Sequence, residues 1–261
     1  MSRMALLLAL SAAFQADEDK IGKLKPPQVL AKVQAAWAKK KGCHFKQEIV
    51  STLLAREPGQ EATAQFDGKL AKDFAAFRGS ADAWARGKEK LIKAKDGSIV
   101  EPKKADAATN RTGSILRNPW IMVSELTRFA APSAFAGEEK VGETECTLIE
   151  TSADEKSVMD QIKEVTGDLK SLEQFYIRDM SAVADRKKSS SLYKAWISRT
   201  DLLVAKLEWT LIIAMNKKSI PFDADKIPDQ IEIRYSMTFT KYDSELEMDL
   251  PPAVKRYFKM P

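Results

Sequence analysis

The sequence predicts an α+β protein built on a curved antiparallel sheet that has one strongly apolar face. Two segments near the C-terminus indicate this, because apolar side chains recur at every second residue over 203–215 and again over 231–239. A helix could not keep such residues on one side, since its period is 3.6 residues. Both segments are longer than an ordinary strand, and long antiparallel strands twist and coil, which favours a curved sheet or partial barrel.

The apolar side chains of these two segments form the candidate binding surface. In the first segment they are Leu203, Ala205, Leu207, Trp209, Leu211, Ile213 and Met215. In the second segment they are Ile231, Ile233, Tyr235, Met237 and Phe239. Polar or charged residues stand between most of them, so a one-residue slip in register would swap the two faces of the sheet.

The N-terminal half predicts one helix followed by a run of strands. Prolines at 26–27 open the helix, and a basic last turn followed by Gly42 ends it. From His44 the period changes to two, with one face made of Phe45, Gln47, Ile49, Ser51 and Leu53. Glycines such as Gly68 and Gly79 then separate five short strands, expected over 62–66, 70–78, 83–86, 90–94 and 98–101. Strands at this spacing are typical of a meander in a sandwich or barrel.

The C-terminal half mixes helices with further strands. Residues 103–113 are polar and predict a loop, and 119–130 predict a helix. A strand is expected over 140–150, with a turn at Gly142. Residues 154–184 predict two amphipathic helices that break near Gly167, and 193–198 predict the strand that precedes the two long ones.

The first sixteen residues have the order of a secretory signal. Arg3 is followed by an apolar run over 4–10 and by small residues that could be cleaved, with Ala16 as a second cut site. The run is too short to span a bilayer as a helix. A buried N-terminal helix is the alternative. The signal predicts an exported protein, periplasmic or otherwise extracytoplasmic, that is soluble after cleavage and forms a single domain over 17–261.

The charge of the chain gives little indication of a charged partner. Its 42 basic and 37 acidic residues give a net charge of +5, and the two signs are interspersed. A nucleic-acid-binding surface would need a basic patch or stripe, and no basic block of that length is present. We therefore expect no nucleic-acid partner. We also expect a monomeric protein.

The two cysteines, Cys43 and Cys146, could pair in an oxidising compartment, or could be unpaired, half-buried strand residues. The only histidine is His44, directly after Cys43, and no metal-binding spacing of cysteines or histidines is present. Neighbours in a strand point to opposite faces, so Cys43 and His44 could not act as a reactive pair. The sequence predicts no metal and no cofactor.

A catalytic constellation is not visible in the sequence. A single histidine removes most Ser-His-Asp and Cys-His schemes, and the usual hydrolase, metalloprotease and nucleotide-binding motifs are missing. We therefore expect a protein that is not an enzyme. The apolar face of the sheet is then the main candidate for a functional surface.

The apolar face permits two interpretations. The helices could pack on it and fill it, or they could cover it incompletely and leave a cavity for an acyl chain or an apolar peptide. Each buried methylene contributes about 0.8 kcal/mol, so a long acyl chain needs no charged anchor. The candidate lining of such a cavity is Leu207, Trp209, Leu211, Ile213, Ile233, Tyr235, Met237 and Phe239.

The order of elements resembles that of a known family. The segments that carry the resemblance are P-x-x-V-L-A-K-V-Q-A-A-W from residue 26, F-K-Q-E-I from 45, W-A-R-G-K-E-K-L-I-K-A-K-D-G from 84, G-E-T-E-C-T-L-I-E from 142 and Y-K-A-W-I-S-R-T-D-L-L-V-A-K-L-E-W from 193, with Leu250-Pro251-Pro252 at the end. Together they resemble the periplasmic outer-membrane lipoprotein carrier family and its mycobacterial lipoprotein relatives. Ser198 stands where that family has an aspartate in its strand-turn motif.

The resemblance implies an unclosed half-barrel of about eleven strands, with helices covering the concave face and an acyl-chain cavity beneath them. It implies binding of lipid or of lipoprotein acyl chains without chemistry, transport across the periplasm, and a membrane-associated delivery partner. Residues 154–191 are longer than the family pattern and could be a helical insertion. The alternative function is a structural, sensor or adaptor domain with a filled core that binds a protein partner.

Overall fold

One sheet organises the chain. The computed structural model describes residues 21, 24–54, 60–128, 133–169, 177, 179–220, 227–243 and 248–260, so the expected signal at 1–16 lies outside the described residues. The eleven strands of the sheet are β1 (Gly42–Ser51), β2 (Ala62–Ala71), β3 (Phe74–Gly79), β4 (Ala83–Arg86), β5 (Glu89–Lys93), β6 (Ile99–Val100), β7 (Ser133–Val141), β8 (Thr144–Ser152), β9 (Ser190–Ser198), β10 (Val204–Ala214) and β11 (Gln230–Thr240).

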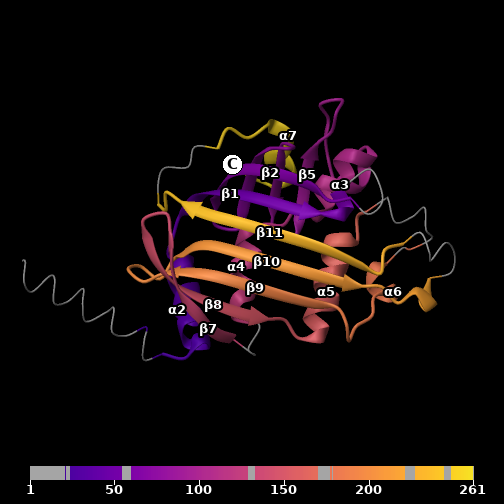
Figure 1. Ribbon diagram of the computed structural model, residues 1–261. Coiled ribbons are helices and arrows are strands. Elements are labelled where there is room, and N and C mark those ends of the chain that lie inside the picture. The colour runs from indigo at the N-terminus through magenta and orange to yellow at the C-terminus, as the bar shows by residue number, and fades with distance from the viewer. Residues whose placement is uncertain are drawn as a thin grey trace, which may run out of the picture.

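The sheet is antiparallel and does not close. Its strand order is β6-β5-β4-β3-β2-β1-β11-β10-β9-β8-β7, so β6 and β7 are the two edges (Figure 1). Every neighbouring pair runs antiparallel. The fold is therefore α+β, an unclosed half-barrel with helices on its concave face, as the sequence resemblance implies.

The helices form a layer on the concave face. They are α2 (Pro26–Ala38), α3 (Ala107–Ile115), α4 (Pro119–Arg128), α5 (Glu155–Thr166) and α6 (Met180–Val183), with short 3₁₀ turns η1 (Thr52–Leu54), η2 (Pro102–Lys104) and η4 (Lys217–Ser219). In Figure 1, α2, α4 and α5 cross behind the long strands. Their apolar side chains share one core with the inward side chains of the sheet. The last helix, α7 (Pro252–Tyr257), packs on the opposite, convex face.

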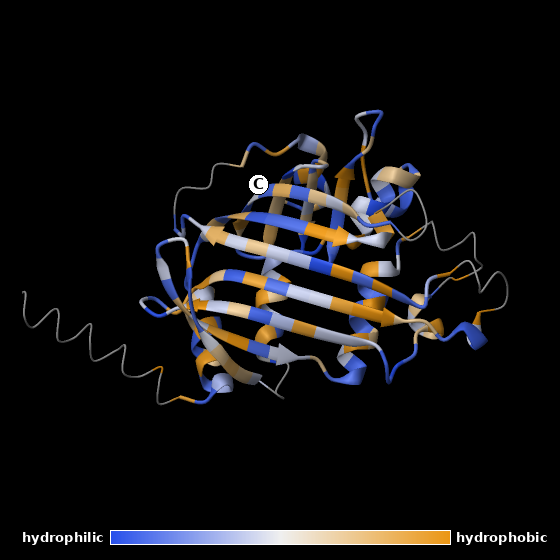
Figure 2. Ribbon diagram, in the orientation of Figure 1, coloured by the Kyte–Doolittle hydropathy of each residue, from blue (hydrophilic) through white to orange (hydrophobic). Residues whose placement is uncertain are grey.

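The two long strands pair in the register that their alternation predicts. The direct cross-strand pairs are Leu207 with Met237, Trp209 with Tyr235, and Leu211 with Ile233. Figure 2 shows the alternation as bands of opposite hydropathy along β9, β10 and β11. On the other side of β11, Phe45 of β1 lies opposite Phe239.

The alternation of β10 is interrupted near its start, where the prediction for Ala205 is wrong. A register shift between Val204 and Lys206 changes the phase of the strand against β9. Val204 is fully buried in the concave core, whereas Ala205 packs on the convex face near Trp196. A bulge adds one residue to a strand, so every residue before it changes face.

Gly68 does not mark a turn, which corrects the predicted boundary between two strands. It lies inside β2 opposite Phe45, and a Cβ built on it would stand 2.1 Å from the Phe45 ring. The turn is instead at Lys72-Asp73, with Lys72 in the left-handed region at φ 51°. A glycine is needed here because the Phe45 ring lies over the backbone of β2.

The loop predicted over 103–113 is mostly helix α3. Asp106 caps this helix, and its carboxylate accepts hydrogen bonds from the backbone N–H groups of Ala108 and Thr109. Asn110 is buried and its side chain donates to the carbonyl oxygens of Pro102 and Asp168. The polar composition of this segment therefore supplies a cap and internal hydrogen bonds rather than a solvated loop.

Helices α4 and α5 lie where the apolar periodicity of their segments predicts helices. Asp154 caps α5 by accepting from the backbone N–H of Ser157, and α5 ends before Gly167 as predicted. Of the second helix expected in this segment, α6 is described, while 170–176 and 178 lie outside the described residues. The strand expected over 140–150 corresponds to β8, whereas β7 occupies residues for which no strand is predicted before 140, and β9 begins earlier than expected, at Ser190.

The possible disulfide between Cys43 and Cys146 is not formed, and both thiols are free and buried. Cys43 lies on β1 in the concave core, and Cys146 lies on β8 among convex-face residues. Three strands separate β1 from β8, so about 19 Å lies between them at the usual strand spacing. A disulfide needs Cα atoms within about 7 Å.

Part of the convex face carries a smaller apolar cluster. Phe74, Trp84 and Leu91 of the meander pack there against Val254 and Phe258 of the C-terminal segment. Within the described ranges, no helix combines the length and the apolar character needed to cross a membrane.

Candidate functional site

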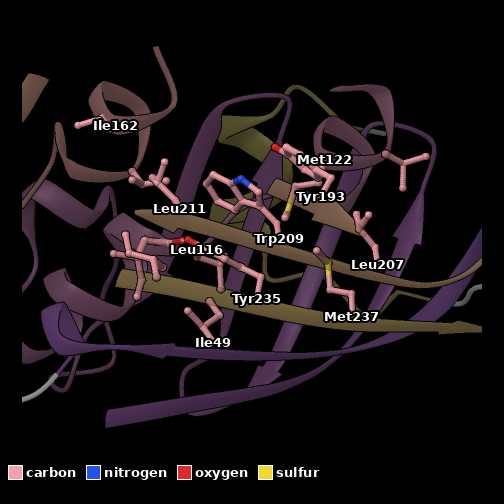
Figure 3. Close-up of a cluster of buried hydrophobic side chains, with 14 of the residues drawn as sticks. Ile49, Leu116, Met122, Ile162, Tyr193, Leu207, Trp209, Leu211, Tyr235 and Met237 are labelled. Atoms are coloured by element: carbon pink, nitrogen blue, oxygen red, sulfur yellow. The ribbon is translucent and has the colours of Figure 1, made fainter. Parts of the chain in front are cut away.

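The candidate ligand-binding residues come together on the concave face and are covered by helices. All eight are buried, none more than 4% exposed, and they belong to the main core. Figure 3 shows Leu207, Trp209 and Leu211 beside Tyr235 and Met237, with helical side chains such as Met122 and Ile162 in the same cluster. The sheet thus presents a continuous apolar surface to the helix layer.

Three aromatic rings cross this surface at one level. Tyr193, Trp209 and Tyr235 are cross-strand neighbours on β9, β10 and β11. Tyr193 stacks on Trp209 with ring centroids 5.7 Å apart, and Trp209 lies 4.8 Å from Tyr235. We call these three residues the aromatic row. The indole N–H of Trp209 donates to Ser191 Oγ at 2.7 Å, so its polar atom is satisfied within the sheet.

The hydroxyl groups of the aromatic row fasten the helices to the sheet. The Tyr235 hydroxyl donates to the backbone carbonyl oxygen of Ile115, at the end of α3. The Tyr193 hydroxyl donates to Glu125 of α4 at 2.5 Å and accepts from Gln161 of α5 at 3.2 Å. One row of side chains therefore contacts three helices through polar atoms.

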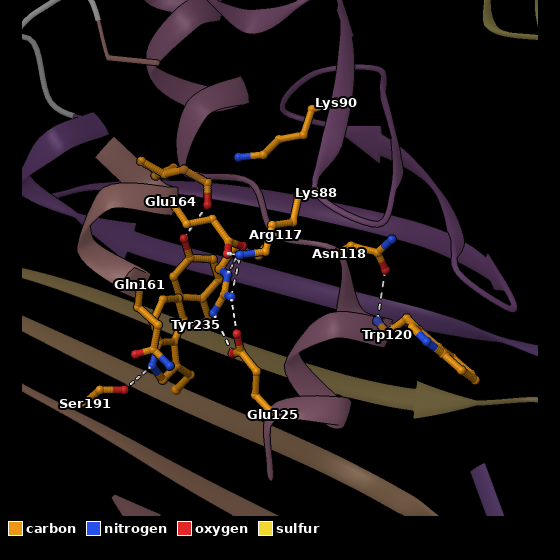
Figure 4. A network of polar contacts seen from close by, with 12 residues as sticks. Lys88, Lys90, Arg117, Asn118, Trp120, Glu125, Gln161, Glu164, Ser191 and Tyr235 are labelled. Atoms are coloured by element: carbon orange, nitrogen blue, oxygen red, sulfur yellow. Dashed lines mark hydrogen bonds and ion pairs between the residues drawn. The ribbon is translucent and has the colours of Figure 1, made fainter. Parts of the chain in front are cut away.

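A buried arginine lies at the centre of these contacts. Arg117 is 1% exposed, and its guanidinium donates to both oxygens of Glu125 at 3.1 and 2.9 Å. It also donates to Glu164 Oε1 from Nε at 3.2 Å and from Nη2 at 3.0 Å, and to the Tyr193 hydroxyl at 3.3 Å. Its carbon Cζ stands 4.4 Å from the centre of the Trp209 ring, a cation–π geometry. Figure 4 shows Arg117 between Glu125 and Glu164.

We call Arg117, Glu125 and Glu164 the buried ion network. Arg117 lies in the short link between α3 and α4, and the next residue, Asn118, fixes that link. The Asn118 side chain accepts from the backbone N–H of Trp120 and donates to the carbonyl oxygen of Asp73. The network therefore joins α4 to α5 directly above the aromatic row.

The charges of the network stabilise one another. Burial alone would raise the pKa of Glu164, but Arg117 and Lys88 outweigh it and lower that pKa to about 2. Lys88 reaches Glu164 from the surface with a 2.7 Å ion pair. Burial opposes the charge of Arg117, yet Glu125 and Glu164 raise its pKa well above its usual value. Arg117 and Glu164 are thus held in their charged forms at neutral pH.

A polar groove lies outside the network, between α4 and α5. Its volume is about 660 Å³, and its lining includes Glu125, Gln161 and Glu164, with Arg128 and Lys156 among its charged residues. Gln161 Oε1 is buried there without a hydrogen-bond partner among the described residues. The groove reaches the network from the solvent side, so the network separates it from the aromatic row.

Two further pockets have volumes of about 340 and 590 Å³. Most of their lining residues lie on the convex face, with His44 in the first and Glu48 in the second, and the lining of the second also includes Gln47 and Phe66 of the concave face. In the part of the chain that the structure describes, no three His, Cys, Asp or Glu side chains gather as a metal site would require. The lining of these pockets does not overlap with the eight candidate residues.

The sequence predicts the apolar residues of this site, but it does not predict the buried ion network. The alternation of β10 and β11 gives Trp209 and Tyr235, and the strand at 193–198 includes Tyr193. Arg117, Glu125 and Glu164 carry no sequence signal that separates them from surface charges. Their spacing matches no motif, and the link and helices that bring them together are tertiary features.

Neither a family model nor a curated protein matches the sequence. The chain is similar in structure to two mycobacterial proteins. Lipoprotein LppX from Mycobacterium tuberculosis is 12% identical with a TM-score of 0.45, over 86% of this chain and 100% of that one. LprF from Mycobacterium bovis is 12% identical with a TM-score of 0.41, over 87% and 96%. A LolA-superfamily protein from Nitrosomonas europaea is 9% identical with a TM-score of 0.28, over 88% and 97%.

Proposed function

We propose that this is an exported, non-enzymatic protein that binds the acyl chains of a lipid or lipoprotein between the concave face of its sheet and the helix layer. The binding surface is the set Leu207, Trp209, Leu211, Ile213, Ile233, Tyr235, Met237 and Phe239. Reversible binding of this kind would suit transport across the periplasm, with a membrane-associated partner that receives the ligand.

The observation that carries the proposal is the way in which the helix layer is attached. Buried ion pairs seldom stabilise a fold more than well-packed apolar residues of the same volume would. Here an arginine and two carboxylates occupy the junction between α4, α5 and an otherwise apolar sheet. An interface of this type favours a cover that separates as a unit, because its polar groups can be hydrated when it opens.

The groove between α4 and α5 indicates where a ligand would approach. It meets solvent on one side and Glu125 and Glu164 on the other. If the ion pairs of Arg117 to these carboxylates were released, the aromatic row would lie directly below. An acyl chain could then replace the apolar side chains of the helices, at about 0.8 kcal/mol per methylene buried.

Fluorescence quenching by a spin-labelled acyl chain tests this location. Trp209 is on the concave face and Trp196 is on the convex face, so they form a matched pair. We expect the labelled chain to quench the wild-type protein, Trp209→Phe to reduce that quenching, and Trp196→Phe to leave it unchanged. Equal quenching in both variants, or none in the wild type, would contradict the proposal.

The alternative is a filled-core sensor or adaptor domain. It is favoured by the complete burial of the eight candidate residues in the closed form. It predicts that purified protein mixed with lipid extract retains no lipid in native mass spectrometry, and that a protein partner is captured instead. Retained lipid that exchanges with added lipid would exclude it.

A further inference from the structure

Gln47 is a buried amide whose polar atoms are not satisfied. It is 2% exposed, and neither its Nε2 nor its Oε1 has a hydrogen-bond partner among the described residues. Buried polar groups are nearly always paired, and an exception in a native structure calls for a functional or physical reason. Gln47 is therefore the most anomalous polar side chain on the concave face.

The side chains next to Gln47 on the concave face of the sheet are all apolar, both along β1 and on the neighbouring strands. Along β1 its neighbours on the same face are Phe45 and Ile49, and across the sheet it lies between Phe66 of β2 and Met237 of β11. The same row continues through Leu207, Ala195 and Ile149. Ile49 and Met237 appear in Figure 3 within the core cluster. A single amide thus interrupts a row of apolar side chains.

A second unpaired donor lies over the same part of the sheet. The indole N–H of Trp37, on α2, is buried without a partner among the described residues. The Trp37 ring packs edge-on against Phe239, with centroids 5.2 Å apart. Phe239 and Met237 are neighbours on the concave face of β11, so Trp37 and Gln47 approach adjacent positions of one surface.

We propose that Gln47, assisted by the Trp37 indole, is a polar subsite that binds the uncharged ester or amide carbonyl of an acyl-chain ligand. The inference rests on the proposed function and adds the chemical class of the ligand. The amide N–H groups of Gln47 donate to the carbonyl oxygen, and its own carbonyl can accept from an amide ligand. The side chain is left unpaired in the closed form because its partner arrives with the ligand.

The chemistry of the site selects a neutral ligand over an anionic one. A buried carboxylate needs a compensating charge, and the row around Gln47 contains none. Arg117, a buried cation on the concave side, is already paired with Glu125 and Glu164. A free fatty acid in its charged form is therefore disfavoured relative to its ester.

The experiment compares methyl palmitate, a hydrocarbon of the same length, and palmitate in competition with a fluorescent acyl probe. For the wild type we expect the ester to bind about tenfold more tightly than the hydrocarbon, as one additional hydrogen bond allows. Gln47→Met should lose most of this preference for the ester. The control is Gln65→Met, because Gln65 is an exposed amide on β2 that donates to Glu48 on the convex face.

Thermal unfolding of the ligand-free protein supplies an independent readout. Gln47→Met should raise the melting temperature, since it removes an unpaired amide from an apolar site. A lower melting temperature, or an unchanged preference for the ester in Gln47→Met, would overturn the subsite while leaving acyl-chain binding intact. Failure of the wild type to bind either the ester or the hydrocarbon would overturn the proposed function, and the subsite with it.

Discussion

At the scale of single residues, Arg117 links the helix layer to the sheet. It contacts Glu125, Glu164, Tyr193 and Trp209, and so touches α4, α5, β9 and β10 at once. Removing one member of a buried ion pair leaves an uncompensated charge, which costs far more than the pair contributes. Arg117 is therefore a sensitive probe of how the helices are held.

We expect Arg117→Met to lower the free energy of unfolding by about 3–5 kcal/mol, because Glu125 and Glu164 would remain buried without their partner. Urea denaturation followed by circular dichroism measures this. The matched control is Arg199→Met, which removes a surface arginine paired with Glu138 and should cost less than about 1 kcal/mol. Similar losses in both variants would show that the network does not fasten the helices.

Because of Glu164, the free energy of unfolding is expected to decrease at acid pH. Its pKa is near 2 in the folded protein, against a usual value of 4.5. A carboxylate with a lowered pKa contributes stability above its unfolded pKa and loses that contribution as pH falls toward the folded value. We expect a loss on the order of 3 kcal/mol between pH 4.5 and 2. Urea midpoints over this range should fall more steeply for the wild type than for Glu164→Gln, and parallel slopes would contradict the assignment.

The sequence predicts the position of some site residues but not of others. Trp209 and Tyr235 follow from alternation alone, since a period of two determines their face and their strand. Gln47 is also placed on the correct face, but its lack of a partner is a property of the packed interior. Arg117 resembles any surface arginine in the sequence, because burial of a charge depends on partners that are distant along the chain.

At the scale of elements, the close packing of β1 on β2 depends on Gly68. The Phe45 ring occupies the space that a side chain at position 68 would need. The sequence shows only a glycine between two apolar stretches, which is equally typical of a turn. The structure shows that the glycine allows one long strand instead of two short ones.

Gly68→Ala should therefore destabilise the protein, by about 1–3 kcal/mol, the usual cost of overpacking a core. Chemical denaturation measures the change. The double variant Phe45→Leu, Gly68→Ala is the control, because a smaller side chain at position 45 leaves room for the added methyl group. If Gly68→Ala is as destabilising in the Phe45→Leu background as in the wild type, the clash is not the cause.

The elements that sequence predicts best are those whose pattern is uninterrupted. Helices α2 and α5 and strand β11 lie where their periodicity places them. Helix α3 is missed because its polar residues are used internally, with Asp106 as a cap and Asn110 in buried hydrogen bonds. The bulge beside Ala205 is missed because a change of phase by one residue leaves the composition unchanged.

At the scale of the whole molecule, the strand order determines the state of the cysteines. Cys43 and Cys146 lie on opposite faces of the sheet with three strands between them. Pairing would require the sheet to be rebuilt. Burial also raises the pKa of Cys43 to about 12, so its thiol is held in the unreactive protonated form.

We therefore expect two free thiols in the unfolded protein, and no change in melting temperature when a reductant is added. Titration with a thiol reagent, with and without denaturant, checks the first statement, and thermal unfolding with and without reductant checks the second. The native protein should react slowly, because both sulfur atoms are buried. Fewer than two titratable thiols after unfolding under non-reducing conditions would show that a disulfide forms.

The open sheet has a consequence for how copies of this protein meet one another. A sheet that does not close leaves backbone hydrogen-bonding groups at its edges, and a second chain can extend such an edge. Strand β6 is short, but β7 is long and largely exposed. A register shift near Gly137 bends β7, and Glu138, Glu139 and Lys140 put three charges in a row along it. If β7 of another copy approached this edge, it would meet a bent strand. It would also bring its own Glu138 and Glu139 close to the same two acidic side chains. The molecule can thus keep its half-barrel open at the edges without acting as a seed for stacked sheets or fibrils.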